Sequence, residues 1–224
     1  MKLFFPKFGI LKLGIIKNCE DMASEGKKLP LVEEFFSLQG EGYHTGKAAY
    51  FIRLGGCDVG CSWCDSRYAW NPELHPMIDT DTIIENALNS GADSVVVTGG
   101  EPLTWNLNHL CSGLKKNNIN TFIETSGAYP MSGEWDWICL SPKRNMPPAD
   151  DICKLANELK VIIQEKIDFE WAEKYRKMVS EECRLFLQPE WSRFEKIIPD
   201  IVGYIKENPS WRISLQIHKY MHIP

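Results

Sequence analysis

The sequence RLGGCDVGCSWCDS at residues 53–66 contains the pattern that decides the fold. Cys57, Cys61 and Cys64 are separated by three residues and then by two, and an apolar run at residues 49–54 precedes them. Because that run is rich in aromatic and branched side chains, it is typical of a buried strand. Glycines in the following loop allow left-handed backbone conformations and a close approach of the chain to a bulky group. The stretch therefore predicts a strand followed by a cysteine-bearing loop.

Three thiolates within this short loop can bind three irons of a [4Fe–4S] cluster, whose usual complement is four cysteines. The remaining iron would then be open to another ligand. A zinc site is the alternative, but structural zinc normally takes four closed ligands, and neither His44 nor His75 stands at a typical spacing. A disulfide framework is disfavoured because eight cysteines in 224 residues is a low density. The spacing favours a cluster and leaves zinc as the second interpretation.

Composition indicates a soluble globular protein, since 44% of the 224 residues are hydrophobic and 25% are charged. The formal net charge of −5 disfavours nucleic acid as a direct partner. No uninterrupted apolar run reaches the length of a membrane span, so no membrane association is expected. Thiolates that hold iron must stay reduced, which favours the cytoplasm. We expect residues 1–28 to be a poorly ordered extension and residues 29–224 to be one domain.

Strand-like and helix-like segments alternate along that domain, which predicts parallel βαβ units. The expected strands lie at residues 32–36, 49–54, 94–98, 119–124, 137–140, 158–163, 184–187 and 212–215. Helices are expected at residues 79–89, where Thr82 and Glu85 suggest a capping box, and along Leu103 to Leu114. Because the chain is short for an eightfold barrel, we predict an α/β fold, a partial (open) parallel β/α barrel of about six strands.

Polar or glycine-containing segments follow nearly every predicted strand, and in parallel sheets the site lies at the carboxyl ends of the strands. The cysteine loop, the Gly-Gly-Glu-Pro turn at residues 99–102, Glu124, Ser141, Gln188 and His218 should therefore meet at one opening. Gln216 and His218 are expected on one face of the final strand. Residues 40–42 form a turn that either is a plain surface turn or presents Gln39 and Glu41.

Two further features have two interpretations each. Asp65 and Ser66, directly after the last cysteine, either cap a helix or offer oxygen ligands to a hard cation such as Mg²⁺. Arg53 lies inside an otherwise apolar strand, where an unpaired charge is costly to bury. It either forms a structural ion pair or binds a substrate carboxylate through two parallel hydrogen bonds.

The cysteine spacing, with an aromatic residue before the last cysteine, resembles the radical S-adenosylmethionine (radical SAM) superfamily, and the Gly-Gly-Glu-Pro turn resembles a second signature of that group. Further motifs at residues 38–42, 51–54, 64–66, 124–127, 141–143, 187–189 and 216–219 resemble the 7-carboxy-7-deazaguanine synthase family. This resemblance extends from about residue 31 to residue 224 and implies the fold of a radical SAM barrel.

The resemblance also implies which residues would bind each cofactor, the metal ion and the substrate. A [4Fe–4S] cluster would be held by Cys57, Cys61 and Cys64, and Mg²⁺ by Ser66. S-adenosylmethionine would contact Gly100, Ser141, Pro142, Lys143, Gln188, Pro189 and Glu190. The substrate, 6-carboxy-5,6,7,8-tetrahydropterin, would contact Leu38, Gln39, Gly40, Glu41, Arg53, Thr98, His218 and Pro224. Serine at position 66 matches a family position that is often threonine, which retains the hydroxyl and loses the methyl group.

The activity so implied is that of a carbon–nitrogen lyase of queuosine biosynthesis. A 5′-deoxyadenosyl radical would remove hydrogen from C6 of the pterin, and ring contraction with loss of ammonia would give 7-carboxy-7-deazaguanine. The family also implies a homodimer and a flavodoxin- or ferredoxin-type reductant. Two alternatives remain open. A glycyl-radical-enzyme activase shares the small size and the cysteine spacing, and a zinc-binding or electron-transfer module would have no catalytic activity.

Overall fold

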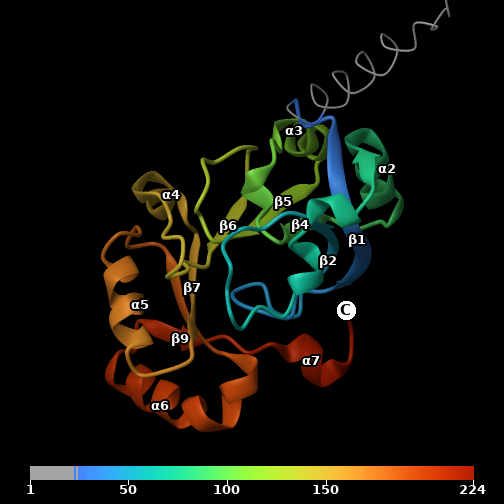
Figure 1. The fold of residues 1–224 in the computed structure, drawn as a ribbon. Helices are drawn as coiled ribbons and strands as arrows, with labels where there is room; N and C mark the ends of the chain where they lie inside the picture. The colour runs from blue at the N-terminus through green and yellow to red at the C-terminus, as the bar shows by residue number, and fades with distance from the viewer. Residues whose placement is uncertain (1–22, 24) are drawn as a thin grey trace, which may run out of the picture.

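A computed structural model describes residue 23 and residues 25–224 of the chain. These residues form one nine-stranded sheet with the strand order β3-β1-β2-β4-β5-β6-β7-β8-β9 (Figure 1). The strands are β1 Lys28–Leu38, β2 Ala48–Leu54, β3 Met77–Asp79, β4 Ser94–Gly99, β5 Asn120–Thr125, β6 Trp137–Leu140, β7 Glu158–Ile163, β8 Arg184–Pro189 and β9 Trp211–Ile213. The α-helices are α2 Thr80–Asn89, α3 Asn108–Lys116, α4 Asp150–Leu155, α5 Asp168–Arg176, α6 Phe194–Glu207 and α7 Ile217–Met221.

The sheet is parallel from β2 to β9, whereas β1 pairs antiparallel with β2 and β3 pairs antiparallel with β1. Its two edges, β3 and β9, are not paired with each other among the described residues, so the barrel is open. This confirms the predicted partial barrel. The sheet is wider than the expected six strands because the antiparallel strands β1 and β3 lie beside β2 at one edge and the three-residue parallel strand β9 is added at the other.

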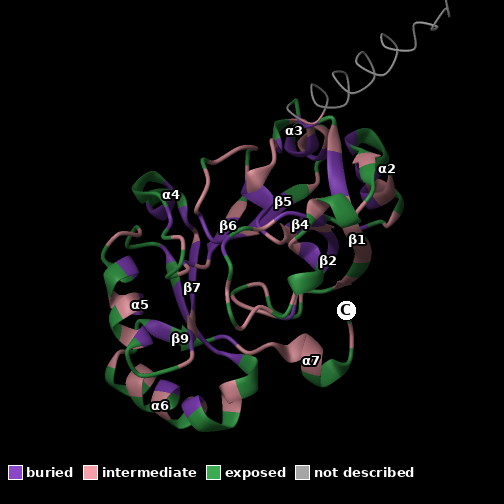
Figure 2. Ribbon diagram, in the orientation of Figure 1, coloured by how far each residue is buried: buried purple, intermediate pink, exposed green. Residues whose placement is uncertain are grey.

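The main hydrophobic core lies between the outer face of the sheet and the helices. Alternate side chains of a strand point to opposite faces, and Tyr50, Ile52 and Leu54 of β2 all belong to this core. Helix residues such as Ile83 and Leu110 pack against the same face. Figure 2 shows this arrangement as buried strands surrounded by helices whose outer surfaces are exposed.

The inner face of the sheet is apolar in the earlier part of the parallel strands and polar toward their carboxyl ends, which are called the upper positions below. Ala49, Phe51, Val96 and Phe122 form a small second core on that face. Two residues further along each strand, alternation places a polar side chain on the same face. The residues at these upper positions are Arg53 on β2, Thr98 on β4 and Glu124 on β5, and on β7 Lys160 follows the buried Glu158 on the same face. The inner apolar layer therefore supports a layer of charged and hydrogen-bonding groups.

Three local predictions were wrong. Leu103 belongs to a 3₁₀ turn, Pro102–Thr104, and the helix expected from this residue begins only at Asn108. Thr82 does not cap a helix, because α2 begins at Thr80 and contains Thr82, and the side chain of Asp79 at the N-cap makes no capping hydrogen bond. Residues 216–219 do not continue the last strand. The chain leaves the sheet after Ile213 and forms the short helix α7, so Gln216 and His218 do not share a strand face.

The extension expected at residues 1–28 falls mainly on residues outside the described part of the chain. Its last residue, Lys28, is the first residue of β1. Of the part that is described, the carbonyl of Gly26 accepts a hydrogen bond from the buried Thr80 Oγ1 at 2.7 Å. Among the described helices, none combines the length and the apolar character that spanning a membrane requires.

Candidate functional site

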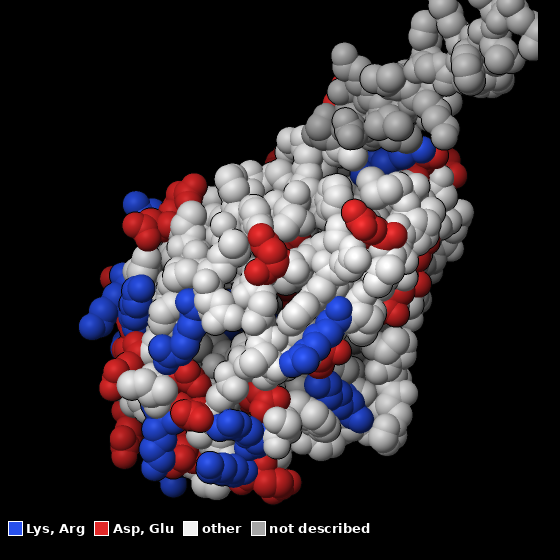
Figure 3. Space-filling model, in the orientation of Figure 1, with Lys and Arg blue, Asp and Glu red and all other residues white. Residues whose placement is uncertain are grey.

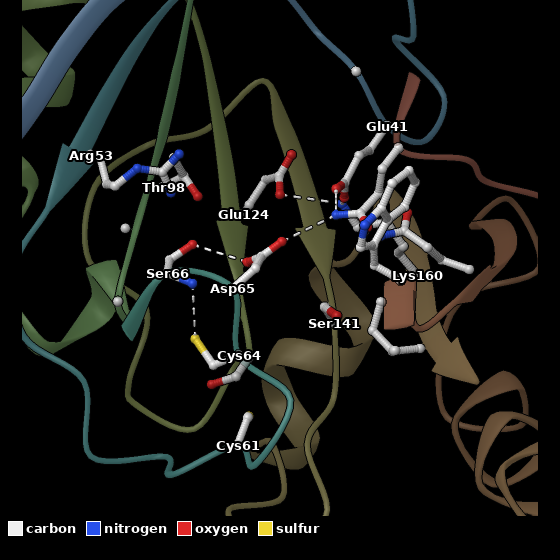
Figure 4. A pocket seen from close by; sticks show the side chains of 18 of the residues that line it. Glu41, Arg53, Cys61, Cys64, Asp65, Ser66, Thr98, Glu124, Ser141 and Lys160 are labelled. Carbon is white, nitrogen blue, oxygen red and sulfur yellow. Dashed lines mark hydrogen bonds and ion pairs between the residues drawn. The ribbon is translucent and has the colours of Figure 1, made fainter. Parts of the chain in front are cut away.

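A pocket of about 440 Å³ lies at the carboxyl ends of the parallel strands (Figure 4). The predicted site residues that line it are Leu38, Gln39, Gly40, Glu41, Arg53, Cys57, Cys61, Cys64, Ser66, Thr98, Gly100, Ser141, Lys143, Gln188, Pro189, Glu190, His218 and Pro224. Pro142 is the exception, because it does not line the pocket and its carbonyl accepts a hydrogen bond from Trp171 Nε1 at 3.4 Å. The predicted convergence of the strand ends on one opening is confirmed.

The cysteine loop forms one wall of the pocket. Cys57, Cys61 and Cys64 are free thiols of intermediate exposure. Burial is the main cause that raises the pKa of the Cys57 and Cys61 thiols, and nearby Lys143 acts in the opposite direction on Cys61. The Cys64 sulfur accepts hydrogen bonds from the backbone N–H of Ser66 and from Trp70 Nε1, both at 3.4 Å. N–H groups directed at a cysteine sulfur are the interactions that tune iron–sulfur clusters.

The three cysteines fit a cluster better than a single ion. Among the described residues, no three His, Cys, Asp or Glu side chains converge closely enough to hold one metal ion together. A cluster of four irons binds each thiolate at a different iron, so its cysteines line one pocket without converging on a point. The donor set of three thiolates at one opening therefore suits a [4Fe–4S] cluster with one iron free for another ligand.

The Gly-Gly-Glu-Pro turn after β4 packs directly against the cysteine loop. The Gly100 N–H donates to the Leu54 carbonyl at 3.0 Å, and the Glu101 N–H donates to the Gly56 carbonyl at 2.8 Å. A Cβ atom at position 100 would lie 2.3 Å from the Gly56 carbonyl oxygen and 2.7 Å from Cys57 Cβ. Only glycine allows this close approach, so the turn sets the position of the first cysteine.

Glu101 joins this turn to the loop after β5. Its carboxylate is 2% exposed and accepts hydrogen bonds from the hydroxyls of Thr125 and Ser126, both at 2.5 Å. The backbone N–H groups of Ser126 and Leu103 donate to it at 2.7 and 3.1 Å. Since a buried carboxylate is stable only when its oxygens accept hydrogen bonds, this residue fixes two loops of the pocket relative to each other.

Arg53 forms the ion pair that was one of its two interpretations, and it also lines the pocket. Its Nε donates to Glu33 Oε1 at 2.6 Å, and the Tyr68 hydroxyl donates to the same oxygen at 3.1 Å. The bond uses one of the five N–H donors of a guanidinium. The other donors suffice for a two-point contact with a carboxylate, so the two interpretations are compatible.

A buried charge network lies on the opposite side of the pocket (Figure 4). Lys160 Nζ donates to Glu41 Oε2 at 2.5 Å and to Glu124 Oε2 at 3.2 Å, and the lysine side chain is only 4% exposed. Gln39 Nε2 donates to Glu124 Oε1, and Gln216 Nε2 donates to Glu41 Oε1, both at 2.8 Å. Burial opposes ionisation of Glu41, but Lys160 and Gln216 outweigh it and lower the pKa of this carboxyl.

The C-terminal segment crosses the open side of the barrel and completes the pocket. The Ile217 N–H donates to the Gly40 carbonyl at 2.9 Å, and the Ser37 hydroxyl donates to the Pro224 carbonyl at 3.2 Å. Lys219 Nζ donates to Asp65 Oδ2 at 2.9 Å, which ties this segment to the cysteine loop. Burial lowers the pKa of His218, although Glu41 opposes that effect.

The remaining predicted residues form the wall between the cysteine loop and the C-terminal segment. Lys143 Nζ donates to the carbonyl and the hydroxyl of Ser141 at 2.7 and 2.6 Å, and burial lowers the pKa of this lysine. Gln188 accepts a hydrogen bond from the Ser214 hydroxyl at 2.7 Å, and Glu190 caps the 3₁₀ turn Trp191–Arg193. These groups surround the opening above the cysteines.

Ser66 supplies an oxygen donor to the pocket, and its hydroxyl donates to Asp65 Oδ1 at 3.1 Å. Mg²⁺ in proteins takes oxygen ligands and uses few of them from the protein itself. The oxygen atoms of Asp65 and Ser66 therefore suit a cation whose other ligands come from a bound substrate. Ser66 also precedes the 3₁₀ turn Arg67–Ala69, but its side chain makes no capping hydrogen bond.

Lys160 is a charged pocket residue that the sequence interpretation missed. The signal was present, because Lys160 is a charged side chain within the apolar run ELKVII of β7, as Arg53 is within β2. Other polar pocket residues without an assigned ligand include Tyr68, Glu101, Glu124, Gln216 and Lys219, and Asp65 was considered together with Ser66 as a cation ligand. Glu124 and Gln216 were expected near the opening without an assigned ligand.

Comparison with known proteins gives a consistent result. The Radical SAM superfamily matches residues 51–141. A 7-carboxy-7-deazaguanine synthase of Flavobacterium psychrophilum is 54% identical over 94% of this chain and 100% of that protein. The protein of the same name from Escherichia coli is 33% identical over 87% of this chain and 98% of its own length. The crystal structure of QueE from Escherichia coli covers 88% of this chain and 98% of that chain with a TM-score of 0.75 and 29% identity. These relatives do not favour the activase alternative.

Proposed function

Because the chain belongs to the family of 7-carboxy-7-deazaguanine synthases, we propose that its pocket converts 6-carboxy-5,6,7,8-tetrahydropterin to 7-carboxy-7-deazaguanine. The enzyme is a radical SAM lyase of deazapurine and queuosine biosynthesis and uses a [4Fe–4S] cluster and S-adenosylmethionine. The observation that carries the proposal is the opposition, within one pocket, of Arg53 on one side and the carboxylates of Glu41 and Glu124 on the other (Figure 4).

The cofactors fit the wall formed by the cysteine loop. Cys57, Cys61 and Cys64 would hold the cluster. S-adenosylmethionine would lie against Gly100, Ser141, Lys143 and the segment from Gln188 to Glu190, whereas Pro142, which does not line the pocket, would support its two neighbours. When bound, the reduced cluster and S-adenosylmethionine supply the abstraction of hydrogen from C6 of the pterin. Gly100 lets the loop backbone approach the cysteines, and Glu101 keeps the neighbouring loop in place.

The charged groups of the pocket favour one orientation of the proposed substrate. Arg53 would bind the 6-carboxylate of the pterin through its remaining N–H donors, with Thr98 beside it in Figure 4. The pyrimidine ring carries N–H donors at its far edge, which suit the acceptors Glu41 and Glu124. Leu38, Gln39, Gly40, His218 and Pro224 would enclose the ring from β1 and the C-terminal segment.

The protein's own residues then orient the substrate and exclude water. The C-terminal segment covers the open side of the barrel through the Ile217–Gly40 and Lys219–Asp65 contacts. Ser66 would ligate Mg²⁺ shared with the substrate. A pocket that surrounds the substrate in this way would hold the reacting carbon in one position and keep competing hydrogen-atom donors away.

The family also suggests the oligomeric state, the electron donor and the location of the enzyme. We propose a homodimer, a flavodoxin- or ferredoxin-type reductant, and a cytoplasmic location that keeps the cluster cysteines reduced. Acidic and basic side chains are interspersed on the face seen in Figure 3, which supports a small-molecule substrate rather than a nucleic acid.

An anaerobic assay tests the proposed function. Purified, cluster-reconstituted protein is incubated with dithionite, S-adenosylmethionine, Mg²⁺ and 6-carboxytetrahydropterin, and the products are identified by mass. Formation of 7-carboxy-7-deazaguanine is expected. Cleavage of S-adenosylmethionine without this product would contradict the proposed substrate and retain the superfamily chemistry. Neither product from fully loaded protein would contradict the proposed activity.

A further inference from the structure

Lys160 takes no part in the proposed function, although it is the most buried basic residue of the pocket among the described residues. Its side chain is 4% exposed, against 14% for Glu41 and 25% for Glu124. A lysine in such a position loses the hydration of its ammonium group, and it must be compensated by anions. Its two partners come from segments far apart in the chain, the loop after β1 and the strand β5. Lys160 therefore joins two walls of the pocket through one atom.

The titratable groups that act on Lys160 come from several elements. They are Glu41 after β1, Glu124 on β5, Cys139 on β6, Lys143 after β6 and Glu158 on β7. His218 on α7 interacts with Glu41 and Glu124, and the residue of β8 that pairs with Lys160 is the apolar Phe186. Burial disfavours the charge on Lys160, but the acidic neighbours together raise its pKa well above the usual value. Burial also raises the pKa of Cys139 far above its usual value, so this neighbour is a neutral thiol near neutral pH. The carboxylates are therefore the partners of the ammonium group.

Each carboxylate is held at two points. Glu41 accepts from Lys160 through Oε2 and from Gln216 through Oε1. Glu124 accepts from Lys160 through Oε2 and from Gln39 through Oε1. An ionised carboxylate accepts only, with about four lone-pair positions, so each retains acceptor capacity toward the pocket that both residues line.

We propose that Lys160 is a positioning residue that fixes Glu41 and Glu124 as a pair of ionised acceptors for the N–H groups of the pterin's pyrimidine ring. This inference rests on the proposed substrate and adds a residue that determines specificity. Without Lys160, two carboxylates would face each other in a buried site, and such pairs take up a proton. A protonated carboxyl of Glu41 or Glu124 would present an O–H donor to an N–H donor of the pyrimidine ring. The hydrogen bond between them would then be lost, and the ring would no longer be recognised.

The test is direct binding, measured by anaerobic titration calorimetry of cluster-loaded protein with S-adenosylmethionine and without reductant, using 6-carboxytetrahydropterin as the ligand. The variant Lys160→Met retains length and loses charge. We expect its Kd to be at least about tenfold higher than that of the wild type near neutral pH. Lys166→Met, at an exposed lysine paired with Asp200, is the matched control and should leave Kd unchanged.

The pH dependence separates positioning from simple loss of packing. In the variant, burial of Glu41 is no longer offset by Lys160, so its pKa rises and a falling pH protonates it. The ratio of variant to wild-type Kd should therefore be larger at about pH 6 than at about pH 8.5. The titration of the ligand itself cancels in this ratio. An unchanged Kd, or a raised Kd whose ratio is independent of pH, would overturn the proposal.

Two further measurements keep the test decisive. Lys160→Arg retains the charge and is used if the methionine variant loses its cluster. Its Kd ratio should not vary with pH, and a ratio that rises toward acid would contradict the proposed role. If wild-type protein binds S-adenosylmethionine but not the pterin, the proposed function fails. If wild-type protein binds the pterin and Lys160→Met binds it equally well, only the role of Lys160 fails.

Discussion

The Nε–H group of Arg53 donates to Glu33 Oε1 at 2.6 Å, so a residue of the antiparallel strand β1 orients a residue of the parallel strand β2. The Tyr68 hydroxyl donates to the same oxygen and completes the support. The guanidinium of Arg53 is thus held by the partly exposed carboxylate of Glu33, and Arg53 also lines the pocket. This relationship explains how a charged side chain is retained within an apolar strand.

Replacing Arg53 by lysine should raise the KM for the pterin because an ammonium group cannot make two parallel bonds to a carboxylate. Loss of one charge-assisted hydrogen bond costs about 1.5–3 kcal/mol, which corresponds to an increase of about 10- to 150-fold. Cleavage of S-adenosylmethionine in the absence of pterin should continue. Glu33→Gln, which keeps an acceptor for Nε, should have a smaller effect. Steady-state kinetics with both variants measures this, and an unchanged KM in Arg53→Lys would contradict the assignment.

Single substitutions of Cys57, Cys61 or Cys64 by alanine should each abolish the cluster, because three thiolates already leave one iron without a protein ligand. Iron and sulfide content and the visible absorbance of anaerobically reconstituted protein measure this. Cys153→Ala, at a buried cysteine outside the pocket, is the control and should retain the full cluster. Loss of the cluster in the control, or its retention in all three pocket variants, would refute the ligand assignment.

Gly100→Ala should impair cluster assembly, because the added Cβ would lie 2.3 Å from the Gly56 carbonyl oxygen in the cysteine loop. One of the two loops must move, which shifts Cys57 from its position. Iron content per chain should fall below that of the wild type. Gly203→Ala makes the matched comparison, since no atom lies within 4 Å of a Cβ there. Helix α6 should gain about 0.5–1 kcal/mol from that change. Equal iron content in Gly100→Ala and wild type would show that the loops tolerate the displacement.

Glu101→Gln should destabilise the domain, because the amide NH₂ group would face N–H and O–H donors where the carboxylate accepts them. A loss of about 2–4 kcal/mol in the free energy of unfolding is expected for a buried charged acceptor with several donors. Urea denaturation of the apo protein measures it without reference to activity. A change smaller than about 0.5 kcal/mol would mean that these bonds contribute little.

Stability should fall as the pH decreases through the range just below 6.5, the usual pKa of histidine. Burial lowers the pKa of both His218 and His44, so the unfolded chain binds more protons than the folded protein in this range. His218→Gln should reduce the slope of unfolding free energy against pH, and the His44→Gln, His218→Gln double variant should reduce it further. One titrating group contributes at most about 1.4 kcal/mol per pH unit. A slope that neither variant changes would contradict this origin.

The strand alternation and the cysteine spacing made the fold and most of the site predictable from the sequence. Polar residues at the ends of predicted parallel strands converge because the fold places those ends together, and Glu124, Ser141 and Gln188 needed only that rule, whereas Thr98 was assigned from the family resemblance. Lys160 follows from the same periodicity, since it lies on the inward face of β7 two residues after Glu158. A functional interpretation was given to Arg53, the charged residue within β2, but none to Lys160, the charged residue within β7.

Other features depend on contacts that no local pattern contains. The capping box proposed at Thr82 failed because Thr80 is buried against the Gly26 carbonyl, a tertiary hydrogen bond that fixes where α2 begins. The final strand ended early because Ile217 pairs with Gly40, which turns the chain across the pocket. The bond between Lys219 and Asp65 joins residues that are 154 positions apart. Such long-range pairs are set by the packed fold, and the sequence carries no periodic signal for them.

The central claim is that this pocket places C6 of the pterin for hydrogen abstraction, and an isotope label tests it most directly. Cluster-loaded protein is given reductant, Mg²⁺, S-adenosylmethionine and 6-carboxytetrahydropterin that carries deuterium at C6, and 5′-deoxyadenosine is analysed by mass. Deuterium in 5′-deoxyadenosine, together with formation of 7-carboxy-7-deazaguanine, is the expected result. Formation of 5′-deoxyadenosine without deuterium from a labelled substrate that is consumed would contradict the claim.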